Sequence, residues 1–448
     1  MYTPHTEEDK QVMLQKIGVN SFEELISVIP EKLRFKGNLN LPEALSELEA
    51  VKYCQALARR NSHQKEYISF LGGGIYDHYI PAVIDHIISR SEFYTAYTPY
   101  QPEVSQGTLQ TIYEYQSLIC ELFAMDVSNA GMYDAASAFA ESCHMARSIT
   151  KRNKILIADT IHPYYRKVID TYTHGLNIPI VNCGCMLGDE GRVSLRGVEE
   201  AIDNDTAAIL VQHPNFYGVL EPVRELSTIA HKYNALLIVC VDPISLGLLA
   251  PPGQYDADIA VGEGQVLGIP PSLGGPLLGI LTCRKDFVRM LPGRLVGKTT
   301  DIEGKTGYVL ILQTREQHIR REKATSNICT NEALCALAAT IYLSIMGKEG
   351  IKEVSRQCYA KSHYLAHAIK SINGYSLAFN QPFFKEFVIK TPIEPKKIIQ
   401  EMLKERIFAG INLSNFNEDW QNMLLVAVSE QRTKQELDRY VEILKELR

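Results

Sequence analysis

Six short runs of apolar and β-branched residues, recurring between positions 154 and 283, limit the fold of this chain more than any other feature. In order they are KILIADT, IPIVNCG, AAILVQH, ALLIVCVD, DIAVGEG and PLLGILTC. Helices of ordinary length fit between the first four runs, at YYRKVIDTYTH, SLRGVEEAID and VRELSTIAHKY. Apolar strands that alternate with helices are typical of a parallel sheet covered on both faces, with right-handed crossovers. The sequence therefore predicts a large α/β domain at 108–330.

The segments on either side of this domain have different patterns. Residues 1–60 contain TEEDKQVMLQKIG and SFEELISVIPEKL, whose capping residues predict a helical N-terminal arm. Residues 61–107 are rich in Tyr, Gly and Pro without a clean period, and they predict an ordered loop segment. Residues 331–448 combine helical stretches with short strands, which predicts a small C-terminal α+β domain.

Composition narrows the classes of function. The chain has 448 residues, of which 46% are hydrophobic and 22% charged, as in globular proteins with more than one core. Its net charge of -6, without long runs of one sign, predicts neither nucleic acid nor a membrane as partner. No basic start followed by an apolar run is found at the N-terminus, and the ten cysteines form no C-x-x-C pair. We therefore expect a cytoplasmic protein that acts on small molecules or proteins.

Three residues have positions that would suit pyridoxal phosphate, a cofactor that this architecture can hold. Asp242 ends the run ALLIVCV, where an acid could pair with the pyridine nitrogen, although a turn Asp before Pro243 is an equal interpretation. His162 lies where an imidazole could stack on the ring, although a lone His is more often a loop residue. The predicted helix start after Gly131 offers N–H groups to a phosphate, although simple packing also explains this glycine.

The lysine that such a cofactor requires is missing. No lysine occurs between Asp242 and Arg284, and the next one is Lys285, after the run PLLGILTC. A Schiff base needs a primary amine, which neither Gln265 nor Arg284 can provide. The sequence predicts that this chain forms no Schiff base itself. The alternative of a stand-alone pyridoxal phosphate enzyme that uses Lys285 stays open.

A basic run near the end of the large domain is a further site candidate. The stretch QTREQHIRREKATSNICT, residues 313–330, carries Arg315, Arg320, Arg321 and Lys323 within nine positions. A solvated helix face is the simpler interpretation. Arginines beside a polar, uncharged tail are, however, well suited to bind a carboxylate or phosphate. A second run, GRLVGKT at 293–299, is one residue short of a phosphate-binding loop and is interpreted as a coincidence.

Several motifs taken together resemble one family. They are FLGGGIYDHYIP, YTAYTPYQPEVSQGTLQ, HPNFYGVLEP, VGEGQVLGIPPSLGGPLLG and REQHIRREKATSNICTN. These motifs look like the amino-terminal half of the glycine cleavage P-protein, and the similarity covers essentially the whole chain. The resemblance implies the fold type I architecture of pyridoxal phosphate enzymes. In many bacteria the P-protein is similar to this chain plus a second, separate chain.

The resemblance also explains the missing lysine. The Schiff-base lysine of the catalytic half lies in a motif that aligns with VGEGQVLG, and Gln265 takes its place here. Pyridoxal phosphate would then be held by the second chain, subunit 2, and none would be bound covalently by this one. Asp242, His162 and Gly131 would be relics of a cofactor site. The resemblance implies a heterodimer or a dimer of heterodimers, and no metal site is predicted.

Two groups of residues would complete the active site of subunit 2. The first is the tyrosine-rich loop with Tyr97, Tyr100, Gln101, Glu103, Ser105 and Gln106; the second comprises Arg320, Arg321, Lys323, Thr325, Ser326 and Asn327. The implied reaction is the decarboxylation of glycine, with transfer of the aminomethyl group to the lipoyl arm of the H-protein. A non-catalytic scaffold that has lost its site remains another alternative.

Overall fold

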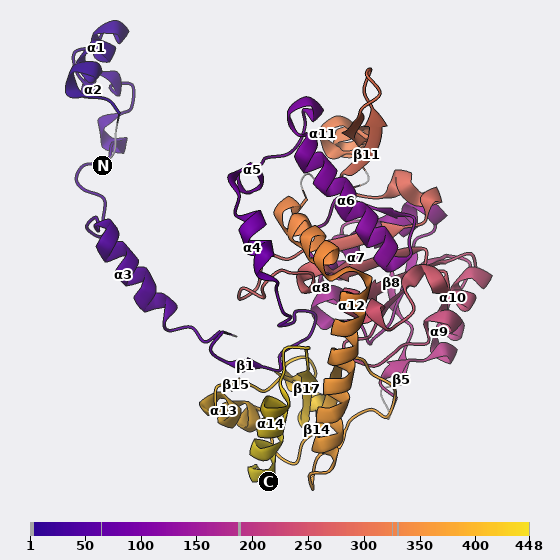
Figure 1. Cartoon of the computed structure of the whole chain (residues 1–448). Helices are drawn as coiled ribbons and strands as arrows, with labels where there is room; N and C mark the ends of the chain where they lie inside the picture. The colour runs from indigo at the N-terminus through magenta and orange to yellow at the C-terminus, as the bar shows by residue number, and fades with distance from the viewer. Residues whose placement is uncertain (1–3, 64, 187–189, 325, 329–330, 448) are drawn as a thin grey trace. The chain divides into compact units, whose positions relative to one another are not determined.

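The computed structural model describes residues 4–63, 65–186, 190–324, 326–328 and 331–447 (Figure 1). Contacts divide the chain into two units, Met1–Ser62 and His63–Arg448. The predicted boundaries within the second unit, at about 107 and 330, stay predictions.

The first unit is helical, as the sequence predicts. It contains α1 (Glu7–Ile17), α2 (Phe22–Leu25) and α3 (Glu47–Ala58). The first and third helices begin with complete capping boxes, in which the cap side chain and an acidic side chain three residues later satisfy each other's backbone N–H groups. The second predicted helix is shorter than expected, because only one turn forms after Ser21.

A seven-stranded sheet forms the centre of the second unit, in the order β2-β10-β9-β8-β7-β3-β4. Its strands are β2 (Val127–Ser128), β3 (Lys154–Ile157), β4 (Ile180–Asn182), β7 (Thr206–His213), β8 (Leu236–Val241), β9 (Ile259–Glu263) and β10 (Gly279–Cys283). All six predicted runs are strands of this sheet. The neighbouring strands β4, β3, β7, β8 and β9 are parallel to one another, whereas β10 is antiparallel to both of its neighbours, β9 and β2.

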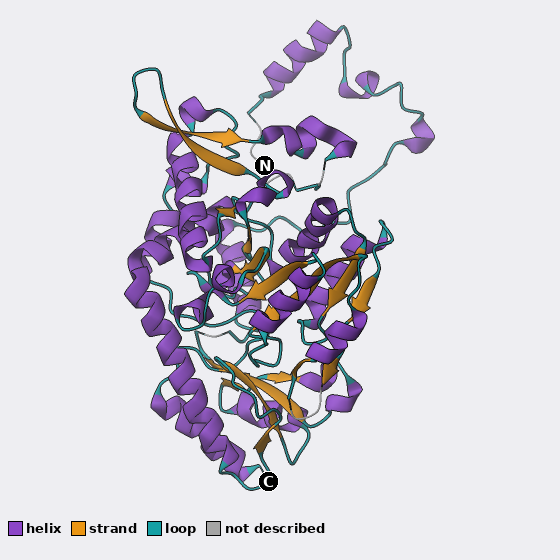
Figure 2. Cartoon of the chain, turned by 90° about the vertical axis from the view of Figure 1, so that its right-hand side faces the viewer, coloured by secondary structure: helices purple, strands orange, loops and turns teal. Residues whose placement is uncertain are grey.

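The sheet is buried on both faces, which explains its uniformly apolar strands. Every residue of β8 and β9 is buried, although successive side chains point to opposite faces. Helices surround the strands (Figure 2). They include α6 (Gln106–Phe123), α7 (Ala135–Thr150), α8 (Pro163–His174), α9 (Leu195–Ala201) and α10 (Val223–Lys232). The predicted α/β architecture is therefore present.

A second, antiparallel sheet lies in the C-terminal part, in the order β13-β14-β17-β16. Its strands are β13 (Ser376–Leu377), β14 (Glu386–Lys390), β16 (Ile411–Asn412) and β17 (Met423–Ala427). Helices α13 (Pro395–Lys404) and α14 (Lys434–Glu446) belong to this part. The predicted loop segment, residues 61–107, contacts this C-terminal part near its start, where β1 (Ile68–Ser69) pairs with β15 (Ile407–Phe408). It then forms two short helices, α4 (Ala82–Ile88) and α5 (Ser91–Tyr94).

One long helix, α12 (Ala333–Lys370), runs from the large sheet to the C-terminal sheet (Figure 1). It bends at Gly347, whose backbone is not helical, so the two helices predicted here form its two halves. By length and composition alone the helix could span a membrane, but 56% of its most apolar window is buried inside the protein. Core helices commonly have this composition.

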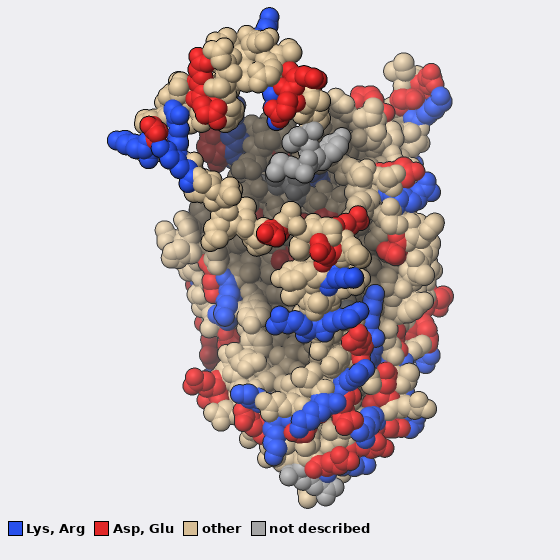
Figure 3. Space-filling model, turned by 90° about the vertical axis from the view of Figure 1, so that its left-hand side faces the viewer, with Lys and Arg blue, Asp and Glu red and all other residues tan. Residues whose placement is uncertain are grey.

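The run 293–299 and the distribution of surface charge both agree with what the sequence predicts. The run 293–299 contributes to a hairpin of β11 (Leu295–Thr300) and β12 (Thr306–Ile311), and it joins no strand to a helix as a phosphate-binding loop would. On the face drawn in Figure 3, Lys and Arg side chains are interspersed with Asp and Glu side chains. This mixture agrees with the similar totals of 46 basic and 52 acidic residues.

The two sheets meet where the loop after β7 approaches β14. Gly218 has a φ of +83°, and a Cβ atom there would lie 1.9 Å from the backbone oxygen of Glu386. Directly after Gly218, Val219 forms a bridge to Phe383, and the Leu220 N–H donates to the oxygen of Pro382 at 2.9 Å. Only glycine permits both this conformation and this approach.

We therefore expect Gly218→Ala to lower the free energy of unfolding by about 2 to 4 kcal/mol, because the methyl group would force the sheets apart at a strained φ. The measurement is urea denaturation of the purified chain. Gly175→Ala is the matched control, because Gly175 has a φ of -64° and no atom within 4 Å of an added Cβ. Equal stability of the Gly218→Ala variant and the wild type would contradict the tight junction.

Candidate functional site

The carboxyl ends of the parallel strands place several polar side chains at one edge of the sheet. Asp242 directly follows β8, Glu263 is the last residue of β9, and Gln265 comes two residues later. Asp242 and Glu263 line the same small cavity. The position predicted for Asp242, at the end of a parallel strand, is confirmed.

A lysine from the C-terminal part pairs with Asp242. The Nζ atom of Lys385 lies 2.7 Å from Oδ2 of Asp242, and the lysine side chain is only 2% exposed. The same Nζ lies 2.9 Å from Nε2 of His78 and 3.5 Å from the ring centroid of Tyr76. The other oxygen of Asp242 accepts from the Ile244 N–H at 3.0 Å, so Asp242 also caps the following turn. The turn interpretation of this residue is thus confirmed, and its other carboxylate oxygen pairs with a lysine of the chain.

Two N–H groups in the first turn of the helix after Gly131 already have acceptors within the chain. Helix α7 begins at Ala135, whose N–H donates to Oε2 of Glu263 at 3.0 Å. The Ser137 N–H donates to the capping side chain of Asp134 at 2.7 Å. Ala135 and Ser137 therefore do not offer open N–H groups to an anion as predicted, because carboxylates of the chain already accept from them.

Gln265, at the predicted position of the Schiff-base lysine, holds another segment in place. Its Oε1 accepts from the Tyr76 N–H at 2.9 Å, and its Nε2 donates to the backbone oxygens of Tyr76 and Ile269 at 3.1 and 2.6 Å. The side chain is 1% exposed. An amide cannot form a Schiff base with an aldehyde. The hydrogen bonds of this side chain instead hold the Tyr76 segment at the edge of the sheet.

His162 is enclosed by the glycine-rich segment and by aromatic rings. Its Nδ1 accepts from the Tyr164 N–H at 3.1 Å, so Nε2 carries the proton and donates to the oxygen of Gly73 at 2.8 Å. Its ring stacks on Tyr165, with 4.6 Å between centroids. Burial lowers the pKa of His162 to about 4, which keeps the imidazole neutral.

Glu386 completes the packing of this site. Its two carboxylate oxygens accept from the Gly73 N–H and the Tyr76 hydroxyl, each at 2.6 Å. Burial raises the pKa of Glu386 to about 7, although both hydrogen bonds act in the opposite direction. A Cβ atom at Gly72 would lie 2.0 Å from this carboxylate, which explains a glycine there.

The residues present do not fit pyridoxal phosphate. The cavity that remains among Tyr76, Asp242, Glu263, Lys385 and Glu386 measures about 30 Å³. That volume holds a water molecule or two, whereas small-molecule pockets measure about 300 to 1,000 Å³. Lys285, the alternative amine, is exposed and follows β10, whose last residue pairs with the first residue of β9. It thus lies at the opposite edge of the sheet, and the geometry contradicts the hypothesis that it serves this site.

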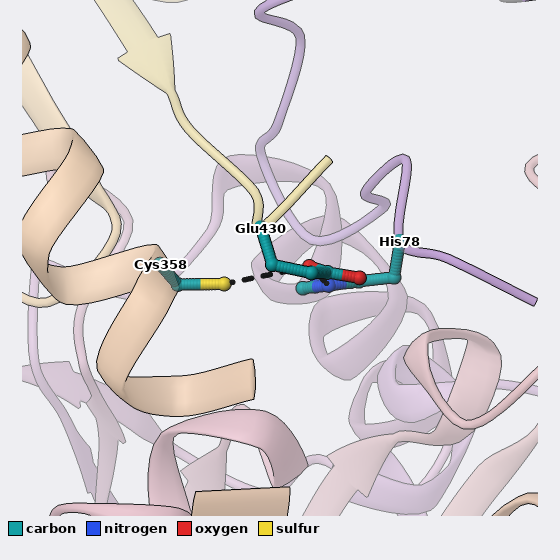
Figure 4. Close-up of side chains that lie close together, drawn as sticks. All are labelled: His78, Cys358 and Glu430. Atoms are coloured by element: carbon teal, nitrogen blue, oxygen red, sulfur yellow. Dashed lines mark hydrogen bonds and ion pairs between the residues drawn. The ribbon is translucent and has the colours of Figure 1, made fainter. Parts of the chain in front are cut away.

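His78, Cys358 and Glu430 form a cluster beside this site (Figure 4). The Lys385 ammonium can only donate, so Nε2 of His78 accepts and its Nδ1–H donates to Glu430 at 2.6 Å. Burial opposes ionisation of Glu430, but His78 and the Tyr79 N–H outweigh it and lower the pKa to about 2. Burial raises the pKa of the Cys358 thiol well above its ordinary value. These contacts indicate a hydrogen-bonded network, because a metal would need a thiolate and an unprotonated Nδ1.

The predicted tyrosine-rich loop lies elsewhere on this unit and is open to solvent. Tyr97 is 82% exposed and lines a hollow of about 340 Å³ together with Thr98, Arg294 and Glu332. Gln101 and Glu103 are also exposed, whereas Ser105 is half-buried at the start of α6. These residues remain candidates for contact with a partner.

Gln106 has a different surrounding from the rest of this loop. Its Nε2 donates to the backbone oxygens of Pro102 and Tyr308 at 2.7 and 2.9 Å, and its Oε1 accepts from the Tyr308 N–H at 2.9 Å. The amide is thus fully used in fastening the loop to the β11–β12 hairpin.

Behind the loop, Arg294 is a buried cation that the sequence did not single out. It is 2% exposed, donates to the Tyr100 hydroxyl at 3.2 Å and lies 3.9 Å from Glu316. Its Nε has no hydrogen-bond partner among the described residues, and the same is true of Nε of Arg315 and Oε1 of Glu316. Burial raises the pKa of Glu316 despite the nearby arginines.

The basic run forms a second hollow. Arg321, Ser326 and Asn327 line a depression of about 530 Å³ with Glu141, whose pKa burial raises to about 7. Arg320 ends the short helix α11 (Gln317–Arg320), and Lys323 is exposed. Thr325 lies outside the described residues. The structure thus brings together Arg321, Ser326 and Asn327, and it places Tyr97 in the other hollow.

Comparison with known proteins identifies the family. The family model of the glycine cleavage system P-protein matches residues 1–444. The chain belongs to the glycine cleavage system P-protein family. It is 54% identical over 443 residues to the probable glycine dehydrogenase (decarboxylating) subunit 1 of Carboxydothermus hydrogenoformans, covering 99% of each chain. It is 52% identical over 446 residues to the protein of the same description from Chloroherpeton thalassium, covering 100% of this chain and 99% of that one.

Solved structures agree with the P-protein assignment. A crystal structure of glycine decarboxylase (P-protein) of the glycine cleavage system, in inhibitor-bound form, matches with a TM-score of 0.91, 39% identity and full coverage of both chains. A sphingosine-1-phosphate lyase from Burkholderia pseudomallei matches with a TM-score of 0.67 at 14% identity, covering 93% and 94% of the two chains. The latter likeness shows the fold alone. The predicted family and the fold type I architecture are thus confirmed.

Several residues that shape this P-protein site were not found from the sequence. Lys385 and Glu386 sit between FF and the strand residues FVIK, and two charges inside an apolar strand would have been the available signal. Tyr76 and His78 belong to the quoted motif FLGGGIYDHYIP, but nothing local indicates that their side chains face Asp242.

The raised pKa of Glu386 predicts a pH effect on stability. A folded pKa of about 7, above the ordinary 4.5, gives stability that is complete at low pH and is lost as pH rises toward 7. Glu386→Gln cannot titrate, so relative to the wild type we expect it to gain about 1 to 3 kcal/mol of unfolding free energy between about pH 5 and pH 8. Urea denaturation across that range measures the difference. Glu114→Gln, at an exposed position, is the control; curves for Glu386→Gln that run parallel to the wild type would refute the assignment.

Proposed function

We propose that this chain is subunit 1 of a glycine dehydrogenase (decarboxylating) and is active only together with a separate subunit 2. The relatives named above carry the description of subunit 1 and match over essentially their full length. The observation that supports the proposal is that Gln265, at the predicted position of the Schiff-base lysine, carries an amide fully used in hydrogen bonds and no amine. Subunit 2 holds the pyridoxal phosphate, which supplies the electron sink for decarboxylation.

The overall reaction removes carbon dioxide from glycine and passes the aminomethyl group to the lipoyl arm of the H-protein. The partners of this chain are thus subunit 2, the lipoylated H-protein and glycine, in the cytoplasm, without nucleic acid or membrane. The contribution of this chain is to form walls and polar anchors beside the cofactor of subunit 2. It binds no cofactor of its own in this scheme.

The tyrosine-rich loop supports a role at the boundary with subunit 2. Tyr97 presents its ring and hydroxyl outward, and the ring of Tyr100 covers the buried guanidinium of Arg294 at 5.3 Å. Exposed aromatic side chains backed by an arginine are typical of surfaces that bind a partner. Phenolic hydroxyls and the guanidinium could orient the carboxylate of glycine or the lipoyl amide without forming a bond to either.

The purified chain alone is expected to show no glycine-dependent exchange of labelled carbon dioxide, because it lacks the amine that holds the cofactor. Addition of subunit 2 and lipoylated H-protein should restore exchange. Co-expression followed by separation of the two subunits gives the control, since activity should disappear on separation and return on mixing. Exchange activity in the isolated chain would show that the proposed division of labour is incorrect.

Tyr97→Ala should lower the turnover of the assembled enzyme by about tenfold or more, because a positioning contact at the channel is lost. Folding of the chain should be nearly unchanged, since this side chain is 82% exposed. Tyr359→Ala, at a 45% exposed position on α12, is the matched control and should keep full turnover. If both variants turn over glycine like the wild type, the loop is not part of the channel. That result would favour the alternative of a non-catalytic scaffold.

A further inference from the structure

We propose that this chain fills its own cofactor site with side chains that replace pyridoxal phosphate group by group, with Lys385 as the central one. The proposal concerns the chain by itself and does not depend on the activity of the assembled enzyme. It identifies what occupies the edge of the sheet where related enzymes of this fold would bind a cofactor. Three replacements carry it: a cation, an anion and an aromatic ring.

The cation is the ammonium group of Lys385. An acid at the end of a parallel strand would hold the protonated pyridine nitrogen of the cofactor, which is a single positive donor. Here the positive donor is the Lys385 ammonium group, whose Nζ lies 2.7 Å from Oδ2 of Asp242. Neither charge reaches water freely, since the side chain of Lys385 is 2% exposed and that of Asp242 is 11% exposed. The acid is therefore already neutralised by a residue of the chain.

The anion is the carboxyl group of Glu263. Three backbone N–H groups point to it, from Ala135 in the first turn of α7 and from Gln265 and Leu278, at 3.0, 3.1 and 3.0 Å. A helix start with converging N–H groups is the usual cradle for a phosphate. Since each of these three donors already has an acceptor, a phosphate would have to displace Glu263 into a buried and apolar surrounding.

The ring is that of Tyr76. It is buried, lies below the Lys385 ammonium at 3.5 Å, and donates through its hydroxyl to Glu386 at 2.6 Å. Gln265 fixes its backbone from both sides, through the N–H and the oxygen of the same residue. The segment that enters the site is thus held by the residue that replaces the catalytic lysine.

These replacements make the site self-sufficient. No side-chain nitrogen or oxygen of Tyr76, Asp242, Glu263, Lys385 or Glu386 is among the buried atoms without a hydrogen-bond partner in the described part of the chain. A bound cofactor would have to expel the Tyr76 segment and separate a buried ion pair, and the separated charges would each lose several kcal/mol of compensation. The chain is consequently committed to a state without the cofactor.

A double-mutant cycle on Lys385→Met and Asp242→Asn tests the central pair. Each single variant leaves one buried charge unpaired and should raise the ratio of unfolded to folded chain by about 100-fold or more in urea denaturation. The double variant removes both charges and should recover most of this loss. Effects of the two changes that simply add, or a double variant less stable than either single one, would overturn the proposal.

The matched control is an exposed ion pair of similar length. Lys404 and Glu401 lie 2.7 Å apart with side chains 67% and 36% exposed. Lys404→Met and Glu401→Gln should each change the ratio by less than about fivefold, because solvent screens such pairs. The contrast separates the effect of burial from the general loss of a salt bridge.

Titration with pyridoxal phosphate, followed by borohydride reduction and peptide mapping, tests the filled site directly. The wild-type chain should bind no cofactor saturably, and no modified lysine should map to Lys385. Saturable binding at one equivalent per chain, or a reduced adduct on Lys385, would overturn the proposal. These readouts are independent of glycine turnover, so the failure of this inference and the failure of the proposed function can be told apart.

Discussion

The buried ion pair between Lys385 and Asp242 joins the large sheet of the second unit to its C-terminal sheet. Asp242 follows the central strand β8, and Lys385 precedes β14 of the C-terminal sheet, so the 2.7 Å contact fixes one sheet against the other. Removing either charge alone from its partner would cost several kcal/mol. Lys385 also contacts Tyr76 and His78, which in turn donates to Glu430, so the pair lies at the centre of this junction.

The same edge of the sheet shows how side chains of the chain itself satisfy backbone groups at a potential ligand site. Helix starts and strand ends present unpaired backbone N–H and C=O groups whatever the side chains, because backbone geometry creates them. If no ligand binds there, those groups need other hydrogen-bond partners. Glu263 accepts from three N–H groups here, and burial raises the pKa of its carboxyl group to about 7 although these hydrogen bonds act in the opposite direction.

The sequence predicted the fold better than the site, for physical reasons. Apolar runs of the right length determine strands locally, so all six predicted strands are present, and the capping residues mark the helix at Glu7. The absence of an amine at Gln265 is a covalent fact that needs no coordinates. Lys385, in contrast, is separated from Asp242 by 143 positions, and only the packing of two sheets brings them together. Occupied N–H groups at Ala135 were equally hidden, because their acceptor comes from another strand.

One group of unsatisfied buried atoms lies behind the tyrosine-rich loop, away from Lys385 and Asp242. Arg294, Arg315 and Glu316, behind the tyrosine-rich loop, each keep a buried polar atom without a partner among the described residues. Buried polar atoms are rarely left unpaired, and one of these belongs to Arg294, whose guanidinium contacts the Tyr100 ring of the loop that we propose meets subunit 2. Under the proposed function, binding takes place at this surface and not at the filled edge of the sheet. Such a surface is what the proposed contact with the cofactor of subunit 2 requires.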